Sequence, residues 1–182
     1  MKPPFETLSS RRLELRKLSP EVFEHLYAQH STDQQMAFLG LDLEALAVEK
    51  EKYDKGYATF NKSYLYFKIV AVASQKVIGW CGFHTWYTDH QRAEIGYGLY
   101  EEEYKQQGLM SEALKVTLDY GFTEMGLHRV EAMIGKDNEA SLALVQKFGF
   151  QYEGNLREHY NVQGTMEDSL IFGLLKHEYN PL

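Results

Sequence analysis

The most constraining feature of this sequence is the stretch EIGYGLYEEEYKQQGLMS, residues 94–111. The composition around it predicts a strand over Arg92–Tyr100 and a helix that starts near Met110 or Ser111. Gly108 stands immediately before this helix. A helix amino terminus offers unpaired amides and the positive end of the helix dipole, and glycine lets a bulky anion approach without a Cβ in the way. The segment therefore predicts an anion-binding loop suited to phosphate or pyrophosphate.

Two other interpretations of the loop stay open on its residues alone. Gly108 can serve simply to turn the chain, because single-glycine loops before helices are common. A nucleotide-binding protein of another α/β fold is disfavoured, because the loop has neither GxxxxGK[ST] nor GxGxxG. The preceding strand also follows a hairpin rather than a βαβ unit.

Strand and helix patterns continue along the chain without a linker or an internal repeat, which predicts one domain over residues 1–182. The expected strands cover residues 12–18, 64–73, 76–86, 92–100, 129–134, 152–160 and 168–175. A first helix is expected to begin at Ser19-Pro20 and run through Leu26, and further helices are expected over residues 42–55, 111–125 and 138–147. A mixed sheet with helices on both faces accommodates this order.

Composition excludes several classes of protein. The 10 Phe, 13 Tyr and 2 Trp residues supply enough apolar surface to bury in a folded core, which argues against an intrinsically disordered chain. The longest apolar runs, such as Leu170–Leu175, are too short for a transmembrane helix, and the opening MKPPFETLSS has no apolar core, so no signal peptide is expected. The single cysteine, Cys81, excludes an internal disulfide and points to the cytoplasm. The net charge of −7 disfavours direct nucleic-acid binding.

A second stretch, GLHRVEAMIGKDNEASLALVQKFGFQYEG at residues 126–154, makes the pattern more specific. Together with RAEIGYGLYEEEYKQQGLMSEAL it resembles the GNAT superfamily of N-acetyltransferases, and most of all its RimJ/RimL-like branch. QQGLMSEAL stands where the family has a [QR]xxGx[GA] loop, and Asn138 and Ser141 fit its N-x-x-S element. KFGF followed by EG fits K-x-GF…EG, and GNLREHYNVQGTMEDSLIFGLL fits the terminal hairpin.

This resemblance covers nearly the whole chain and implies the GNAT fold. That fold is α/β (α+β), with a central mixed, mostly antiparallel sheet of about six to seven strands flanked by helices on both faces. The loop departs from the family pattern at Lys105, where Gln or Arg is usual, and at Met110, where a small residue is usual. These departures leave the register of the backbone contacts open by one residue.

The resemblance also implies an enzyme that moves an acetyl group from acetyl-CoA onto a primary amine by direct attack. A protein or peptide N-terminal α-amine is the first choice. A small amine, such as a polyamine or an antibiotic, and a non-catalytic acyl-CoA-binding module are the alternatives. Only a neutral amine attacks, and at pH 7 deprotonation costs ~1.4 kcal/mol for an α-amine but ~4.6 kcal/mol for a lysine-like amine. A homodimer is compatible with this branch, and no membrane or nucleic-acid partner is expected.

Three residues are candidates for the chemistry. Glu94 is the candidate base, Ser141 the candidate donor to the leaving thiolate, and Tyr160 a substrate-side alternative that binds or orients the amine. Each also has an ordinary structural explanation: an ion-paired glutamate, a helix-capping serine and a buried, hydrogen-bonded tyrosine.

The expected cofactor contacts surround the loop and the helix that follows it. Leu99 or Tyr100 would supply the backbone N–H for the oxyanion. Asn138 would contact the pantetheine arm, cap its own helix, or do both. The full set is Leu99, Tyr100, Gln106, Gln107, Gly108, Leu109, Met110, Ser111 and Asn138.

Other reactive residue types are expected to be structural. The seven histidines show no paired ligand spacing, so no metal is expected. Cys81 is predicted to be a small buried hydrophobe, and Lys115 and Lys147 are predicted to be solvated. The acidic run Glu101–Glu103 beside the loop is either solvated or attractive to a cationic acceptor.

Overall fold

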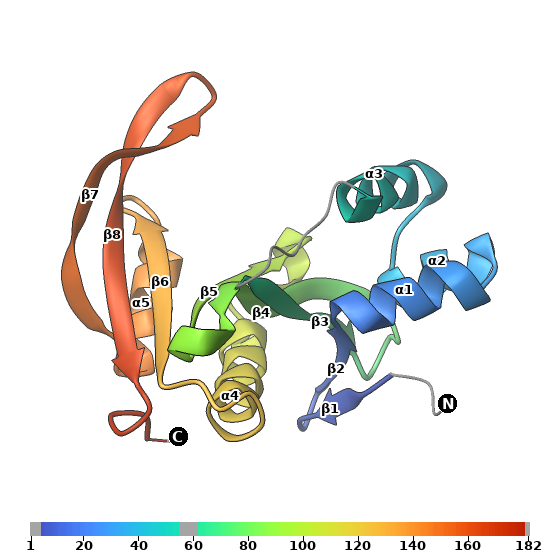
Figure 1. Cartoon of the computed structure of the whole chain (residues 1–182), viewed down its shortest axis with the longest axis horizontal. Helices are drawn as coiled ribbons and strands as arrows, with labels where there is room; N and C mark the ends of the chain where they lie inside the picture. Colours follow the sequence, from blue (N-terminus) through green and yellow to red (C-terminus); the bar gives the residue numbers. More distant parts are fainter. Residues whose placement is uncertain (1–4, 55–61, 181–182) are drawn as a thin grey trace.

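The computed structural model describes residues 5–54 and 62–180, whose eight strands form one sheet in the order β1-β2-β3-β4-β5-β6-β8-β7 (Figure 1). Neighbouring strands are antiparallel except β5 and β6, which run parallel. The strands are β1 (Thr7–Ser9), β2 (Leu13–Leu18), β3 (Ser63–Ala71), β4 (Val77–Tyr87), β5 (Arg92–Leu99), β6 (Arg129–Gly135), β7 (Gln151–Val162) and β8 (Thr165–Leu175). The mixed, mostly antiparallel sheet is therefore confirmed, with one strand more than the upper expectation.

Helices cover both faces of the sheet, as expected. They are α1 (Pro20–Gln29), α2 (Thr32–Leu39), α3 (Leu43–Asp54), α4 (Leu109–Thr123) and α5 (Glu139–Lys147), with short 3₁₀ turns η1 (Thr88–His90) and η2 (Glu102–Tyr104). Side chains alternate between the two faces of the sheet along β2. Leu13 and Leu15 therefore join the core beneath α4, while Leu18 joins the core beneath α1–α3. Among the described residues, no helix has the length and apolarity needed to cross a bilayer.

Two elements are absent from the sequence prediction. β1 has three residues and pairs only with the neighbouring β2, so it is too short to show a periodic pattern. α2 begins with a capping box in which Ser31 and Gln34 satisfy each other's backbone amides, and it ends at Gly40 with φ +68°. Ser31-x-x-Gln34 is a recognisable start signal, so the sequence does contain the information for α2.

The boundaries of two predicted helices also need correction. α4 begins at Leu109, one to two residues before the expected Met110 or Ser111, because Gly108 itself is the N-cap residue. α3 is described to Asp54. Its expected end near Gly56 lies outside the described residues.

The parallel strands β5 and β6 pair over only three residues, Arg92–Glu94 with Arg129–Glu131. Beyond Glu94, β5 continues along β4 as far as Leu99, whereas β6 continues along β8 to Gly135. The two strands therefore separate in the middle of the sheet, and this separation positions the candidate site.

Candidate active site

A cavity of about 220 Å³ lies where β5 and β6 separate. Its walls come from β4, β5 and β6 and from the start of α5, and it brings together three of the predicted site residues: Glu94, Asn138 and Ser141. Tyr160 is not part of its lining. A base candidate, an amide and a hydroxyl thus converge on one small polar space.

Glu94 lies at the point where the parallel pairing ends. Its side chain is 12% exposed, and its Oε2 lies 3.6 Å from Nδ1 of His84, the residue opposite it on β4. Burial, reinforced by the negative charge of Glu131 opposite it on β6, raises the pKa of Glu94 to about 7. A carboxylate with this pKa is well matched to general base chemistry near neutral pH.

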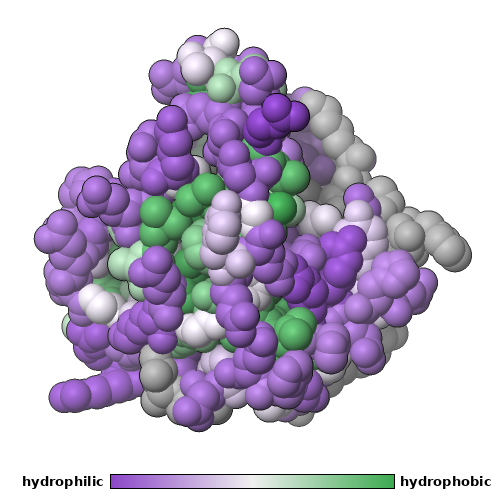
Figure 2. All heavy atoms as spheres, turned by 90° about the vertical axis from the view of Figure 1, so that its left-hand side faces the viewer, coloured by the Kyte–Doolittle hydropathy of each residue, from purple (hydrophilic) through white to green (hydrophobic). Residues whose placement is uncertain are grey.

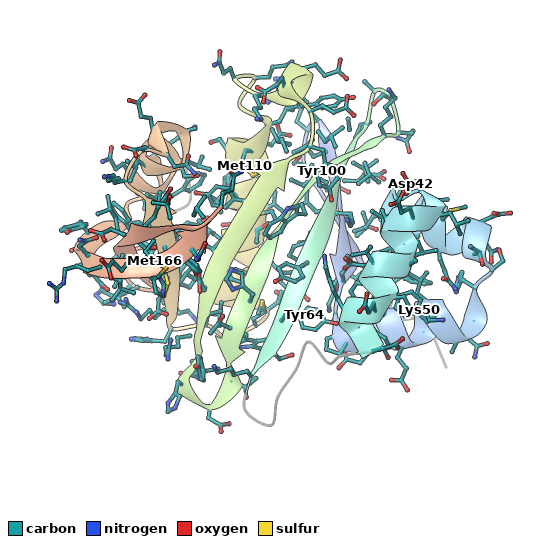
Figure 3. The ribbon with its side chains drawn as sticks, turned by 90° about the horizontal axis from the view of Figure 1, so that it is seen from above. Asp42, Lys50, Tyr64, Tyr100, Met110 and Met166 are labelled. Carbon is teal, nitrogen blue, oxygen red and sulfur yellow. The ribbon has the colours of Figure 1, made fainter. Side chains whose placement is uncertain are left out.

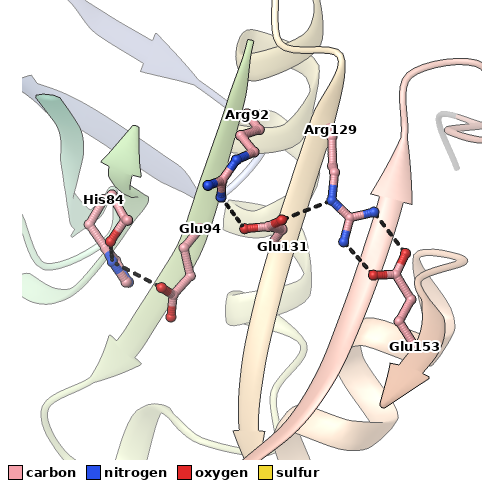
Figure 4. Close-up of polar contacts among 7 residues, drawn as sticks. His84, Arg92, Glu94, Arg129, Glu131 and Glu153 are labelled. Carbon is pink, nitrogen blue, oxygen red and sulfur yellow. Dashed lines mark hydrogen bonds and ion pairs between the residues drawn. The ribbon is translucent and has the colours of Figure 1, made fainter. Parts of the chain in front are cut away.

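Glu131 belongs to a row of alternating charges that crosses the sheet (Figure 4). It accepts hydrogen bonds from Arg92 Nη1 and from Arg129 Nε, both at 2.9 Å, and Arg129 also forms a bidentate pair with Glu153. Gly173 on β8 makes room for this pair, since a Cβ there would lie 2.6 Å from Arg129 Nη1. The row thus places Glu131, paired with two arginines, beside Glu94.

His84 is a site residue that the sequence analysis does not identify, because it treats all seven histidines as structural. A β-bulge follows it on β4, with Thr85 at φ +48°. Burial lowers the pKa of His84, so the imidazole is neutral at pH 7. Only the register of β4 against β5 reveals that His84 faces Glu94, and spacing along the sequence does not encode that register.

Asn138 and Ser141 both lie at the start of α5. The Oδ1 atom of Asn138 accepts a hydrogen bond from the Ser141 amide at 3.1 Å, so the helix-capping role expected for Asn138 is present. Burial raises the pKa of Tyr97 on β5, and an interaction with Ser141 opposes this rise. Tyr97 also lines the cavity, so it is a second cavity residue absent from the sequence prediction.

Tyr160 lies on β7 after an irregular segment in which Glu158 has φ +51°. Its side chain is 47% exposed. Burial and the charge of Glu94 both raise its pKa, so Tyr160 lies within electrostatic range of the cavity but outside its wall. This position suits contact with an acceptor more than contact with the thioester.

The predicted anion loop has the expected backbone geometry. Gly108 adopts φ +72° as the N-cap of α4, without a side-chain cap. The first-turn amides of Leu109, Met110 and Ser111 have no carbonyl partner within the helix. A Cβ at Gly108 would meet only Arg12 Nη2, at 3.8 Å, so the space in front of these amides is open. Gln106 precedes the turn at φ +57°, and the side chain of Gln107 donates to the Glu103 carbonyl.

Two cations flank this helix start, and neither is predicted from the sequence as part of the site. Arg12 Nη1 donates to the Gln107 carbonyl at 3.2 Å, and Arg12 Nε pairs with Glu112 at 2.8 Å. Lys147 is exposed, as expected, but its Nζ also donates to Ser111 Oγ at 2.7 Å. Lys147 adds positive potential beside the free amides of α4, whereas Glu112 balances the charge of Arg12.

The backbone of β5 distinguishes between the two candidate oxyanion donors. The amide of Tyr100 already donates to the Ile78 carbonyl at 3.0 Å, so it is occupied. Antiparallel pairing alternates, which directs the Leu99 amide away from β4 and toward the side where β6 has separated. Leu99 therefore fits the donor role and Tyr100 does not.

The other reactive side chains behave as structural groups. Cys81 is fully buried, and burial raises the pKa of its thiol to about 12, which confirms the predicted small hydrophobe. Lys115 pairs with Asp119 one turn along α4 at 3.1 Å. Within residues 5–54 and 62–180, no three His, Cys, Asp or Glu side chains are grouped to hold a metal ion.

Comparison with known proteins decides the family. Residues 12–151 match the family model described as the acetyltransferase (GNAT) domain. The chain belongs to the GNAT acetyltransferase family. This GNAT protein is 33% identical over 174 residues to the "uncharacterized N-acetyltransferase YoaA" of Bacillus subtilis (strain 168), covering 94% of this chain and 98% of the relative.

Other relatives of this GNAT protein differ in the substrates that their names state. It is 31% identical over 90 residues to the spermidine N(1)-acetyltransferase of Escherichia coli (strain K12), covering 50% of this chain and 48% of the relative. The crystal structure of a ribosomal-protein-S5-alanine acetyltransferase from Vibrio fischeri shares its fold with a TM-score of 0.66 at 19% identity, over 97% of this chain and 100% of that chain. The GNAT fold and the N-acetyltransferase activity are thus confirmed, with acetyl-CoA as the family's cosubstrate.

Proposed function

We propose that this GNAT protein acetylates the N-terminal α-amine of a protein or peptide, as expected of the RimJ/RimL-like branch. The observation that carries the proposal is Glu94, a buried carboxylate on the wall of the cavity between β5 and β6, with its pKa raised to about 7. Proton transfer to such a base is uphill by ~1.4 kcal/mol from an α-amine of pKa ~8. From a lysine-like amine of pKa ~10.4 it is uphill by ~4.6 kcal/mol.

Acetyl-CoA supplies the thioester, and the chain supplies the groups that hold it. The amides of Leu109, Met110 and Ser111 would bind the diphosphate at the start of α4, with Lys147 adding positive charge beside them and Arg12 holding the Gln107 carbonyl. Gln106 and Gln107 shape the turn before Gly108. Asn138, on the wall of the cavity, would contact the pantetheine arm between β5 and β6.

Each remaining group has one role in the transfer. Glu94 accepts the proton from the amine, which frees the nitrogen lone pair to attack the thioester carbon. The Leu99 amide donates to the carbonyl oxygen as negative charge develops on it. The C–N bond forms and the C–S bond breaks, and Ser141 donates a hydrogen bond to the departing thiolate. The second proton leaves the nitrogen as the amide forms and is taken up by the thiolate, so coenzyme A leaves as the free thiol. Tyr160 would orient the acceptor from β7.

A small polyamine is the second candidate acceptor. It is favoured by the similarity to a spermidine N(1)-acetyltransferase and by the net charge of −7, which attracts cations. Its amines have pKa values near those of lysine, so they demand a stronger base than Glu94.

The test uses the protein with acetyl-CoA and a matched set of acceptors. Thiol release is measured with N-terminally free peptides, the same peptides blocked at the N-terminus but carrying a lysine, and spermidine. We expect turnover with the free peptides, and mass spectrometry should place the acetyl group on the α-nitrogen. Turnover with spermidine alone would contradict the proposed acceptor. Tight acetyl-CoA binding without turnover on any amine would indicate a non-catalytic module.

A further inference from the structure

A second and larger cavity, of about 410 Å³, lies between the sheet and helices α1 and α3. Its walls are mostly aromatic and include Tyr64, Tyr66, Trp80 and Tyr100. Tyr64 and Tyr100 are seen on the sheet beside α3, the helix that carries Lys50 (Figure 3). We call this space the aromatic pocket. No step of the transfer described above uses it.

The aromatic pocket and the reaction cavity share a wall. Trp80 lines both of them, and it lies on the same face of the sheet as His84, four residues further along β4. Its indole lies over β5, because a Cβ at Gly96 would lie 2.9 Å from Trp80 Cη2 and one at Gly98 would lie 3.3 Å from Nε1. The two glycines thus let Trp80 lie flat between the two spaces.

Tyr66 provides a second link between the two spaces. Its ring packs edge-on against Trp80 at 5.4 Å and lies 6.5 Å from the ring of His84. Tyr66 and Trp80 therefore connect the wall of the pocket to the side of the reaction cavity that holds His84 and Glu94, on the same face of the sheet.

The charges in the aromatic pocket do not favour a cation. Glu49 faces Lys52 across 3.6 Å. Lys68 Nζ lies 2.9 Å from the Tyr100 hydroxyl, and within the described part of the chain no carboxylate forms an ion pair with it. A second cation entering the pocket would lose its hydration beside Lys68. An apolar or aromatic group would gain from burial against the rings.

We propose that the aromatic pocket selects the acceptor by the side chain next to its amine, favouring an apolar or aromatic side chain and rejecting a cationic one. This inference rests on the proposed function, since it assigns side-chain specificity to an N-terminal α-amine acceptor. Lys68 and Trp80 are then specificity-determining residues: Lys68 repels cationic side chains, and Trp80 supplies the surface on which the apolar side chain packs.

The test compares kcat/KM for peptides that differ only in their first residue, which is Phe, Leu, Ala, Asp or Lys. We expect kcat/KM for the Phe peptide to exceed that for the Ala peptide at least tenfold, and kcat/KM for the Lys peptide to be the lowest of the five. Lys68→Glu should raise kcat/KM for the Lys peptide at least tenfold relative to the Ala peptide, and should lower kcat/KM for the Asp peptide. Lys68→Gln, which removes the charge without inverting it, should give a smaller change in the same direction.

Lys76→Glu is the matched control, because Lys76 is exposed in the turn between β3 and β4 and the substitution changes charge equally. It should leave the order of the peptides unchanged. Equal kcat/KM for all five peptides, or an order that neither Lys68 variant alters, would overturn the pocket assignment while leaving N-terminal acetylation intact. Acetylation of spermidine but of no peptide would instead overturn the proposed function itself.

Discussion

At the scale of single residues, the account depends on how the fold alters the acidity of one glutamate. Glu94 is an ordinary carboxylate in the sequence, and only its burial and its register opposite Glu131 raise its pKa to about 7. The family motif identifies the residue. It cannot supply the pKa, because Glu131 lies 37 positions away in the chain and its proximity depends on parallel pairing.

Replacing Glu94 by Gln removes the base while keeping the shape of the side chain. We expect kcat to fall by about 10²- to 10⁴-fold, with little change in acetyl-CoA affinity measured by calorimetry. The wild-type rate should rise with pH up to about 7, where Glu94 becomes ionised, and this limb should disappear in Glu94→Gln. A variant that keeps both its rate and its pH profile would exclude Glu94 as the base.

A substitution at Glu131 tests why the pKa of Glu94 is raised. Because its negative charge raises the pKa of Glu94, Glu131→Gln should lower that pKa and move the acidic limb of the kcat/KM profile to lower pH. Glu153→Gln is the control, since it removes an equal charge from the far end of the same row. If both variants shift the limb equally, or neither shifts it, the assigned charge effect is wrong.

At the scale of elements, sequence pattern predicts the helices and strands that have long periodic runs and clear start or stop residues. α4 and α5 follow Gly108 and Asn138, which the structure shows as their N-caps. Sequence pattern does not identify β1, because three residues are too few for a pattern, and it does not identify α2, because the capping box stands before a weakly apolar run. Arg12 and Lys147 were not predicted as part of the site because tertiary contacts alone bring them to the start of α4.

A negative charge placed at the start of α4 should prevent acetyl-CoA from binding. Gly108→Glu should abolish acetyl-CoA binding, because the new side chain would fill the open space before the α4 amides and repel the diphosphate. Gly164→Glu is the control for backbone strain: Gly164 also has positive φ, +91°, but lies in the turn between β7 and β8 with no neighbour within 4 Å. Unchanged affinity in Gly108→Glu, measured by calorimetry, would show that the diphosphate binds elsewhere.

At the scale of the whole molecule, two cores pack on opposite faces of one sheet, and strands β2 and β3 contribute to both. We therefore propose that residues 1–182 unfold as a single domain. Heat should produce one cooperative transition, with calorimetric and van't Hoff enthalpies in agreement. Acetyl-CoA at a hundred times its Kd should stabilise the fold by about 2.7 kcal/mol and raise Tm by about 5 to 10 °C. Two separate transitions would contradict the single domain.

The assembly and location of the molecule remain predictions. Seen from the side of β7 and β8, hydrophobic residues are visible in the middle of the face among hydrophilic ones (Figure 2). Exposed apolar side chains on this hairpin include Tyr152, Val162 and Met166. This surface supports the expected homodimer, which sedimentation would detect as twice the mass of the 21.1 kDa chain. The cytoplasmic location is measured separately, by cell fractionation.

The central claim is that the amides at the start of α4 bind the diphosphate of acetyl-CoA, which places its thioester in the cavity beside Glu94. A crystal structure of the complex with coenzyme A tests this directly. The account predicts diphosphate oxygens about 3 Å from the amides of Leu109, Met110 and Ser111, with the thiol between β5 and β6 near Ser141. Coenzyme A bound at any other surface, with these amides facing only water, would contradict it.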